Sequence, residues 1–331
     1  MNPFEYERAD DPGRAVATVA ARPGAMFLGA GTNLVDHLKL GVERPDLLVD
    51  VTRLALDRIE PRPGGGVRVG ATARNSDVAA HPLIRERYPV LASALLAGAS
   101  GQLRNVATTG GNLLQRTRCP YFRDVTTPCN KRTPGAGCSA LEGHNRDHAI
   151  LGASEHCVAV HPSDMAVALT AVDAEVRILG PAGERALPVA DLYRAPGDAP
   201  DRDTVLAHGE LITAVDLPDL PMAARSAYRK VRDRASFAFA LVSVAAAVEV
   251  RDGVITASRV VFGGVAHRPW RAHRTEEALR GASAADEAAF RAAADAELAA
   301  ARPLAHNAYK VPMARNVLVS VLRGLTREET R

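Results

Sequence analysis

Residues 24–41 read GAMFLGAGTNLVDHLKLG, and this stretch decides how the first part of the chain folds. An apolar, strand-like run enters a loop with Gly29 and Gly31, and a helical pattern follows. Consecutive backbone N–H groups in such a loop form a concavity for phosphate, and glycine permits close approach. The Rossmann fingerprint requires a third glycine where this chain has Leu34, and no strand–helix–strand unit follows. The loop therefore predicts either a phosphate site of another kind or an ordinary tight turn.

A second loop of small residues, NVATTGGNLL, covers residues 105–114. The hydroxyl of Thr108, the glycines 110 and 111 and the amide of Asn112 suit a pyrophosphate or a ribityl chain. A plain turn is the alternative here as well. Two such loops in one domain favour a phosphate-binding site more than either loop does alone.

The rest of the first two thirds predicts alternating helices and strands. Asp11 and Pro12 are typical of a helix start, and Ser163 is a typical N-cap. We expect strands at 45–52, 66–73 and 210–218, a helix at 90–99 that stops at Gly101, and a helix followed by a strand within 161–180.

Beyond a boundary placed near residue 222, the pattern changes. Residues 227–266 predict long strands joined by a hairpin at Asp252–Gly253. Helical patterns follow at 274–281, 284–300 and 313–323. The chain as a whole is therefore predicted to be a mixed α+β protein.

The bulk properties exclude several classes of protein. The 331 residues carry a net charge of only +3, and aromatic residues are 4%, which does not favour nucleic-acid binding. No run approaches eighteen apolar residues, so no membrane span is expected. The N-terminus lacks a basic start and an apolar core, so we expect no secretion signal and a cytoplasmic location. Cysteines in that compartment are thiols or metal ligands rather than disulfides.

All four cysteines fall between residues 119 and 157, with the spacing Cys119-x9-Cys129-x8-Cys138-x18-Cys157. Such crowding favours a shared metal site over four unrelated thiols. The C-x2–4-C pairs of zinc ribbons are absent, and four thiolates hold a [4Fe–4S] cluster in many spacings, so the spacing does not choose iron over zinc. The flanking cations would offset an anionic cluster; they are Arg116, Arg118, Lys131 and Arg132.

Seven segments, in order along almost the whole chain, give a family resemblance: NPFEYERA, FLGAGTNLVDHLKLGVERPDLLVDV, LRNVATTGGNLL, HPSDMAVALTAVDA, ELITAVDLP, YRKVRDRASFAFALVSVA and GGVAHRPWRA. With them the chain resembles the FAD-binding subunit of the xanthine dehydrogenase, or molybdenum hydroxylase, family. Its cysteine-bearing insert resembles the branch of aldehyde oxidoreductase flavin subunits that hold an extra [4Fe–4S] cluster. Hydroxybenzoyl-CoA reductase also has a cluster in its flavin subunit, but its insert looks different.

The resemblance implies two domains. Residues 1–222 would form an FAD-binding domain of the vanillyl-alcohol-oxidase (PCMH) type, with the [4Fe–4S] insert at about 115–160. Residues 223–331 would form a smaller α+β lobe like the C-terminal domain of the CO dehydrogenase flavoprotein, an antiparallel sheet with helices.

The resemblance also implies the ligands of both cofactors. Thr108, Gly111 and Asn112 would approach the flavin, Asp164 would hydrogen-bond it, and Ile212 would contact it. Lys230 would lie close to the isoalloxazine; the plain interpretations are a helix-terminal charge for Asp164 and a solvated lysine for Lys230. The pyrophosphate would be wrapped by residues 26–34, which are Met26, Phe27, Leu28, Gly29, Ala30, Gly31, Thr32, Asn33 and Leu34. The cluster ligands would be Cys119, Cys129, Cys138 and Cys157.

The implied function is electron transfer. A partner subunit with a molybdenum cofactor would oxidise an aldehyde, a small [2Fe–2S] subunit would pass the electrons on, and FAD in this chain would deliver them to a small-molecule acceptor. The alternatives are a flavin subunit whose four cysteines hold a structural zinc ion, a subunit of a hydroxybenzoyl-CoA-reductase-like complex, or a binding module without flavin. A partner with a twin-arginine signal would move the complex to the periplasm.

Overall fold

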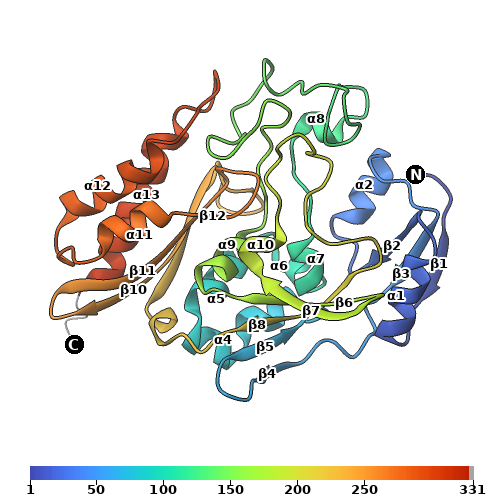
Figure 1. The fold of residues 1–331 in the computed structure, drawn as a ribbon, viewed down its shortest axis with the longest axis horizontal. Coiled ribbons are helices and arrows are strands. Elements are labelled where there is room, and N and C mark those ends of the chain that lie inside the picture. Colours follow the sequence, from blue (N-terminus) through green and yellow to red (C-terminus); the bar gives the residue numbers. More distant parts are fainter. Residues whose placement is uncertain (328–331) are drawn as a thin grey trace.

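A computed structural model describes residues 1–327 of the chain as two lobes with three sheets (Figure 1). The first sheet is parallel, in the order β1 (Glu5–Arg8), β3 (Leu47–Asp50) and β2 (Ala25–Leu28). Helix α1 (Pro12–Ala20) joins β1 to β2, and α2 (Leu34–Leu40) joins β2 to β3. Asp11 caps α1 with its side chain and Pro12 opens the helix, as the sequence predicts.

The second sheet has five strands in the order β4-β5-β8-β6-β7, all pairs antiparallel. Its buried face packs against α5 (Pro89–Ala97) and α9 (Asp164–Ala171) in the largest core of the chain. The predicted N-cap Ser163 is confirmed, because its Oγ accepts from the N–H of Ala166 at 3.0 Å. The strands are β4 (Ile59–Pro61), β5 (Val67–Gly70), β6 (Glu175–Gly180), β7 (Gly183–Pro188) and β8 (Leu211–Leu217), and the remaining helices are α3 (Asn75–Ala80), α4 (Pro82–Arg87), α6 (Gly101–Arg104), α7 (Thr109–Leu113) and α10 (Val189–Leu192).

One predicted helix end is wrong. Helix α5 ends at Ala97, with Gly98 as its C-cap, and Gly101 opens α6 instead of stopping α5. Ala99 turns the chain with a φ of 49°, and the Ser100 hydroxyl then caps the new helix by accepting from the N–H of Leu103 at 3.3 Å. The serine before the glycine therefore makes Gly101 a helix start.

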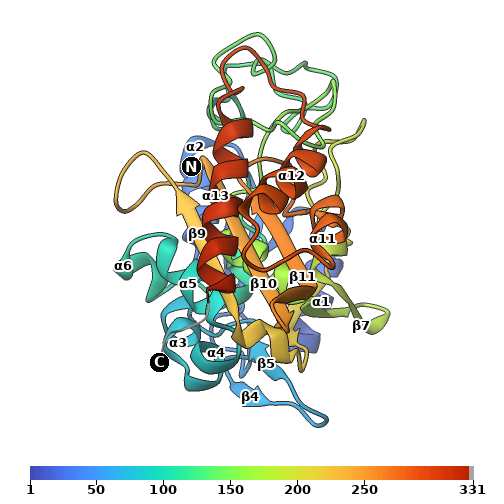
Figure 2. The ribbon, with the colours of Figure 1, turned by 90° about the vertical axis from the view of Figure 1, so that its left-hand side faces the viewer.

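The C-terminal lobe is a four-stranded antiparallel sheet, in the order β12-β11-β10-β9, covered by three helices (Figure 2). Its hairpin turns at Asp252 and Gly253, with φ of 50° and 73°, as a type I′ turn requires, so the predicted hairpin is confirmed. The strands are β9 (Ser226–Val231), β10 (Val242–Arg251), β11 (Val254–Gly263) and β12 (Trp270–Arg271), and the helices are α11 (His273–Leu279), α12 (Glu287–Leu298) and α13 (Lys310–Thr326).

The predicted domain boundary at residue 222 falls in a 3₁₀ turn, η1 (Pro221–Ala224), that leads from β8 to β9. Residues 328–331 of the predicted second domain lie outside the described residues. No helix in the described part of the chain is long and apolar enough to cross a membrane.

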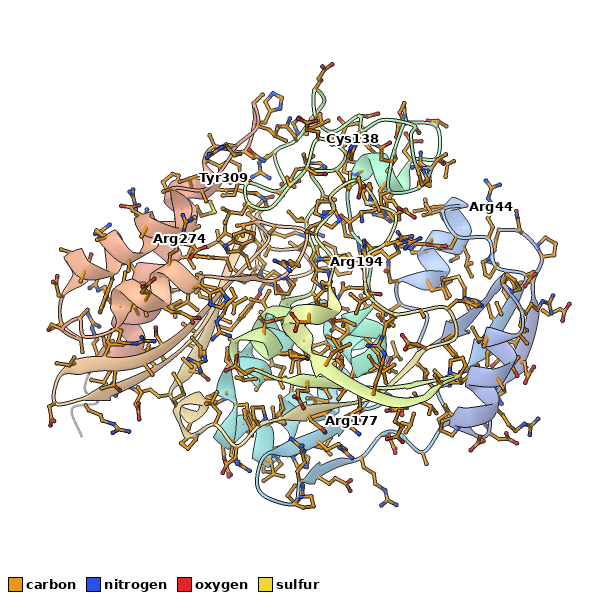
Figure 3. The ribbon with its side chains drawn as sticks, viewed as in Figure 1. Arg44, Cys138, Arg177, Arg194, Arg274 and Tyr309 are labelled. Atoms are coloured by element: carbon orange, nitrogen blue, oxygen red, sulfur yellow. The ribbon has the colours of Figure 1, made fainter. Side chains whose placement is uncertain are left out.

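The cysteine-bearing segment forms irregular loops beyond one end of both lobes, with one short helix, α8 (Pro120–Arg123) (Figures 1 and 2). Side chains near α13 fasten it: Asn307 donates to the carbonyls of His148 and Ala149 at 3.2 Å, and the Tyr309 hydroxyl donates to the carbonyl of Arg146 at 3.1 Å. Figure 3 labels Cys138 in these loops and Tyr309 at the neighbouring end of the C-terminal lobe. The segment is thus bound to the lobe that follows it in the sequence.

Candidate functional site

The two predicted glycine loops meet at one cavity of about 310 Å³. The cavity lies where the loop after β2 faces the start of α7 and the strand β8. Of the sequence-predicted residues, those that line it are Met26, Phe27, Gly29, Ala30, Gly31, Thr32, Asn33, Leu34, Thr108, Gly111 and Ile212. Leu28 and Asn112 are not among its lining residues.

Close packing between the loops explains their small residues. A Cβ on Gly29 would lie 3.0 Å from Thr108 Oγ1, and one on Gly111 would lie 2.8 Å from the same oxygen. Gly31 has a φ of 72°, and a Cβ there would lie 2.8 Å from the Val35 side chain. Thr108 accepts a hydrogen bond from the N–H of Gly111 at 3.2 Å. The loops therefore offer a narrow, backbone-lined cradle that larger side chains would fill.

The two predicted asparagines organise neighbouring segments. Asn33 Oδ1 accepts from the backbone N–H of Arg116 at 2.8 Å, which ties the first loop to the start of the insert. Asn112 Oδ1 accepts from the Ser163 hydroxyl at 2.7 Å, which ties the second loop to α9. Asn112 thus holds the second loop against α9 without lining the first cavity.

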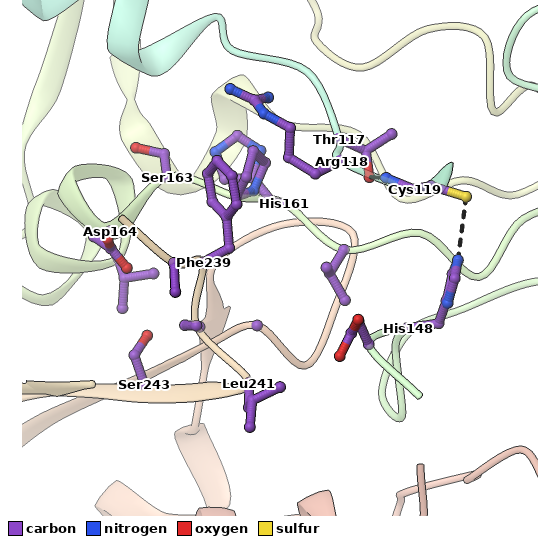
Figure 4. Close-up of a pocket in the computed structure, with 18 of the residues that line it drawn as sticks. Thr117, Arg118, Cys119, His148, His161, Ser163, Asp164, Phe239, Leu241 and Ser243 are labelled. Carbon is purple, nitrogen blue, oxygen red and sulfur yellow. Dashed lines mark hydrogen bonds between the residues drawn. The ribbon is translucent and has the colours of Figure 1, made fainter. Parts of the chain in front are cut away.

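A second pocket, of about 260 Å³, lies between the insert, α9 and the C-terminal lobe (Figure 4). Its walls include Arg118, His161, Asp164 and Phe239. A smaller cavity lies between the two: Leu114 and Arg116 border it and the first cavity, and Thr117, Val160 and His161 border it and the second pocket. Three neighbouring cavities therefore follow one another from the glycine loops to Asp164.

Asp164 faces the second pocket, whereas Lys230 is not among its lining residues. Lys230 Nζ donates to Asp164 Oδ2 at 2.7 Å and to the Ala97 carbonyl at 3.2 Å. The Tyr228 hydroxyl donates to the other oxygen of Asp164 at 2.5 Å. The ion pair is buried, with 3% of the Lys230 side chain and 9% of the Asp164 side chain exposed. The cation of Lys230 is therefore neutralised behind the pocket wall.

All four cysteine side chains line one small cavity inside the insert. Cys129 and Cys138 face each other in an isolated antiparallel bridge, and all four thiols are free of disulfides. Burial raises the pKa of Cys119 to about 12 and that of Cys157 to about 11. Cys119 also borders the second pocket, and its sulfur lies 3.1 Å from His148 Nε2 (Figure 4). The thiols are gathered, but within residues 1–327 no group of three or more His, Cys, Asp or Glu side chains is arranged to hold a metal ion.

A partly buried polar network that the sequence did not reveal joins the insert to the first domain. Asp203 accepts from Arg116 Nε at 2.6 Å and from Lys131 Nζ at 2.5 Å. Burial raises the pKa of Asp203, but the two cations outweigh burial and hold that pKa below its usual range. Arg116 also pairs with Glu43 at 2.5 Å, and Lys131 borders the cysteine cavity. The network therefore extends from Glu43, in the domain that contains the glycine loops, to the cavity that the four cysteines border.

Comparison with known proteins matches the chain over nearly its full length. Residues 2–220 match the model for the FAD binding domain in molybdopterin dehydrogenase, and residues 226–325 match the CO dehydrogenase flavoprotein C-terminal domain. The aldehyde oxidoreductase FAD-binding subunit PaoB of Escherichia coli (strain K12) is 52% identical over 324 residues, which cover 97% of this chain and 98% of that one. The glyceraldehyde dehydrogenase medium chain of Sulfolobus acidocaldarius is 26% identical, with 86% and 83% covered.

Solved structures agree on the fold. The matching chain of carbon monoxide dehydrogenase from Hydrogenophaga pseudoflava has a TM-score of 0.75 at 25% identity, with 97% of this chain and 96% of that chain covered. The two-lobed α+β fold that the sequence predicted is therefore confirmed. This chain belongs to the FAD-binding medium subunits of the molybdenum hydroxylase family.

Proposed function

We propose that this chain is the FAD- and [4Fe–4S]-containing electron-transfer subunit of a molybdenum-cofactor-dependent aldehyde oxidoreductase. One observation carries the proposal: the four cysteines border one cavity, and Cys119 borders both that cavity and the pocket that Asp164 faces. A cluster held by these thiols would adjoin the space proposed for the flavin. The name of the 52% identical relative favours an aldehyde as substrate.

The residues around the neighbouring cavities fit an FAD. The glycine loops present backbone and hydroxyl groups without side-chain bulk, which suits a pyrophosphate. Gly29, Gly31, Thr108 and Gly111 would hold the phosphates, and Asp164 would accept a hydrogen bond from the ring. When bound, FAD supplies the ability to take up two electrons and pass them on.

The chain's own residues would order this site. Tyr228 and Lys230 donate to the two oxygens of Asp164 and thereby fix the orientation of the carboxylate at the pocket. Ser163 fixes the start of α9, and with it the position of Asp164, through its bond to Asn112. Asp164 is thus set to accept a hydrogen bond without rearrangement.

The insert fits a four-thiolate cluster in its donor set. Cys119, Cys129, Cys138 and Cys157 supply four sulfurs around one cavity, and Lys131 also lies on its wall. A bound [4Fe–4S] cluster supplies one-electron transfer. Partner subunits with a molybdenum cofactor and a [2Fe–2S] cluster, and a small-molecule acceptor, complete the proposed path.

The test is anaerobic purification of the complex, with iron, zinc and FAD counted per chain and an EPR spectrum of the reduced protein. We expect one FAD and four irons per copy of this chain, beyond the iron of a [2Fe–2S] subunit. Substitution of Cys157 by serine removes those four irons and leaves FAD in place. One zinc per chain without the extra iron would refute the cluster and support a structural clip.

A further inference from the structure

The pocket beside Asp164 is lined by one arginine, Arg118. Three acids line this pocket, and each is already paired: Asp164 with Lys230, and Asp147 and Asp233 with Arg146. Arg118 lines the same pocket, yet it takes part in no ion pair among the described residues. The acid that acts on it, Asp36, is paired with Arg123. Arg118 is therefore the arginine on the pocket wall that has no ion-pair partner of its own among the described residues.

The guanidinium of Arg118 is held in place by weak partners. It donates to the carbonyl of Arg116 and, at 3.5 Å, to Gln115 Oε1, and it stacks over the Phe239 ring at 4.7 Å from the centroid. Burying a cation without a counter-ion is unfavourable, and such sites are often functional.

The Arg118 side chain points away from the cysteine cavity. Figure 4 shows the side chains of Arg118 and Cys119 pointing to opposite sides of the chain, Arg118 toward His161 and Phe239 and Cys119 toward His148. The other cations that flank the cysteines are already engaged: Arg116 and Lys131 pair with Asp203, and Arg132 donates to main-chain carbonyls. Arg118 alone among the four lines the pocket that Asp164 faces.

We propose that Arg118, stacked on Phe239, is the cationic residue that stabilises the reduced, anionic isoalloxazine ring of FAD in this pocket. The assignment rests on the proposed position of FAD along the neighbouring cavities. It replaces Lys230, whose charge Asp164 neutralises, as the source of positive charge at the ring. A reduced flavin that has taken two electrons and one proton is an anion, and a nearby cation favours it over the neutral oxidised ring.

The experiment measures the reduction potential of FAD in the purified complex by anaerobic titration against a reference dye. Arg118→Gln should lower the equilibrium constant for flavin reduction by at least about tenfold, because one close charge is lost. Arg118→Lys keeps the charge and should stay near the parent. Arg123→Gln removes the same charge from a neighbouring arginine outside the pocket and is the matched control.

An Arg118→Gln complex that retains FAD and titrates like Arg123→Gln would overturn the proposal. So would an unchanged flavin potential with a raised KM for the electron acceptor, since that result assigns Arg118 to acceptor binding. If Arg118→Gln loses FAD, Phe239→Leu provides the second test: it removes the stack, and its flavin must become harder to reduce. A parent complex purified without any FAD would instead refute the proposed function.

Discussion

The buried pair of Lys230 and Asp164 gives the sharpest prediction for stability. Lys230→Met removes the cation and leaves the carboxylate in a site where 9% of its side chain is exposed. Breaking one side of a buried pair costs about 3–5 kcal/mol of unfolding free energy. Two features place this case near the lower end: Tyr228 still donates to Asp164, and Arg232 still donates to the Ala97 carbonyl at 2.7 Å.

We therefore expect a loss of about 3 kcal/mol, which corresponds to a fall in Tm of about 6–10 °C for a domain of this size. The assay is thermal unfolding followed by circular dichroism, with urea unfolding for the free energy. Arg251→Met is the matched control, because it breaks an exposed pair with Glu249 and should cost less than about 1 kcal/mol.

A double-mutant cycle isolates the pair from other effects. Asp164→Asn keeps an oxygen for Tyr228 and removes the charge, so the double variant Lys230→Met/Asp164→Asn should recover about 2 kcal/mol relative to the sum of the single changes. Additive single changes, or a Lys230→Met variant as stable as Arg251→Met, would refute the reasoning that this pair is a buried, mutually dependent unit.

Four further predictions follow from other sites. Gly31→Val should weaken FAD retention about tenfold or more, because its Cβ would meet Val35; FAD per folded chain measures it, and full retention would contradict the role of the loop. Cys138→Ser should lose the insert iron while Ser139→Ala, in the same loop, keeps it; iron analysis decides, and equal iron in both would speak against the ligand set. Gly152→Ala should cost about 1–3 kcal/mol in urea unfolding, because a Cβ there would lie 2.7 Å from the Trp270 ring at a φ of 60°; an unchanged midpoint would argue against this close packing. Burial lowers the pKa of His267 to about 3, so between pH 6.5 and 3 the unfolded chain binds a proton that the folded chain does not. The free energy of unfolding therefore decreases as the pH is lowered through this range, by up to about 1.4 kcal/mol per pH unit. His267→Gln should flatten that slope in urea midpoints at pH 7, 5 and 4, and an identical slope would contradict the prediction.

Local patterns predicted those parts of the structure that depend on neighbours in sequence. The Asp11 and Ser163 caps and the Asp252–Gly253 turn were correct because the residues that form each one lie within a few positions. The prediction that a helix stops at Gly101 also used only neighbouring residues, and it was wrong because Ser100 caps a new helix that begins at Gly101. The gathering of the four cysteines also agreed with their crowding in the chain.

The charge arrangement needed the tertiary structure. Arg116 and Asp203 are 87 positions apart, and nothing in a polar, proline-marked connection indicates which cation Asp203 will meet. The prediction that Lys230 lies close to the flavin did not include its partner: strand alternation puts Lys230 on the same side of β9 as Tyr228, with both side chains against Asp164. Partners of this kind are chosen by register and packing rather than by local pattern.

The fastening of the insert by Asn307 and Tyr309 has a consequence for biogenesis. The cysteines are synthesised by residue 157, but the side chains that bind their loops follow about 150 residues later and lie beside the last helix. On the ribosome the thiols would emerge well before the scaffold that gathers them. Loading of iron and sulfur therefore belongs after Asn307 and Tyr309 have left the ribosome, and a truncation before Asn307 should yield protein that does not take up the cluster.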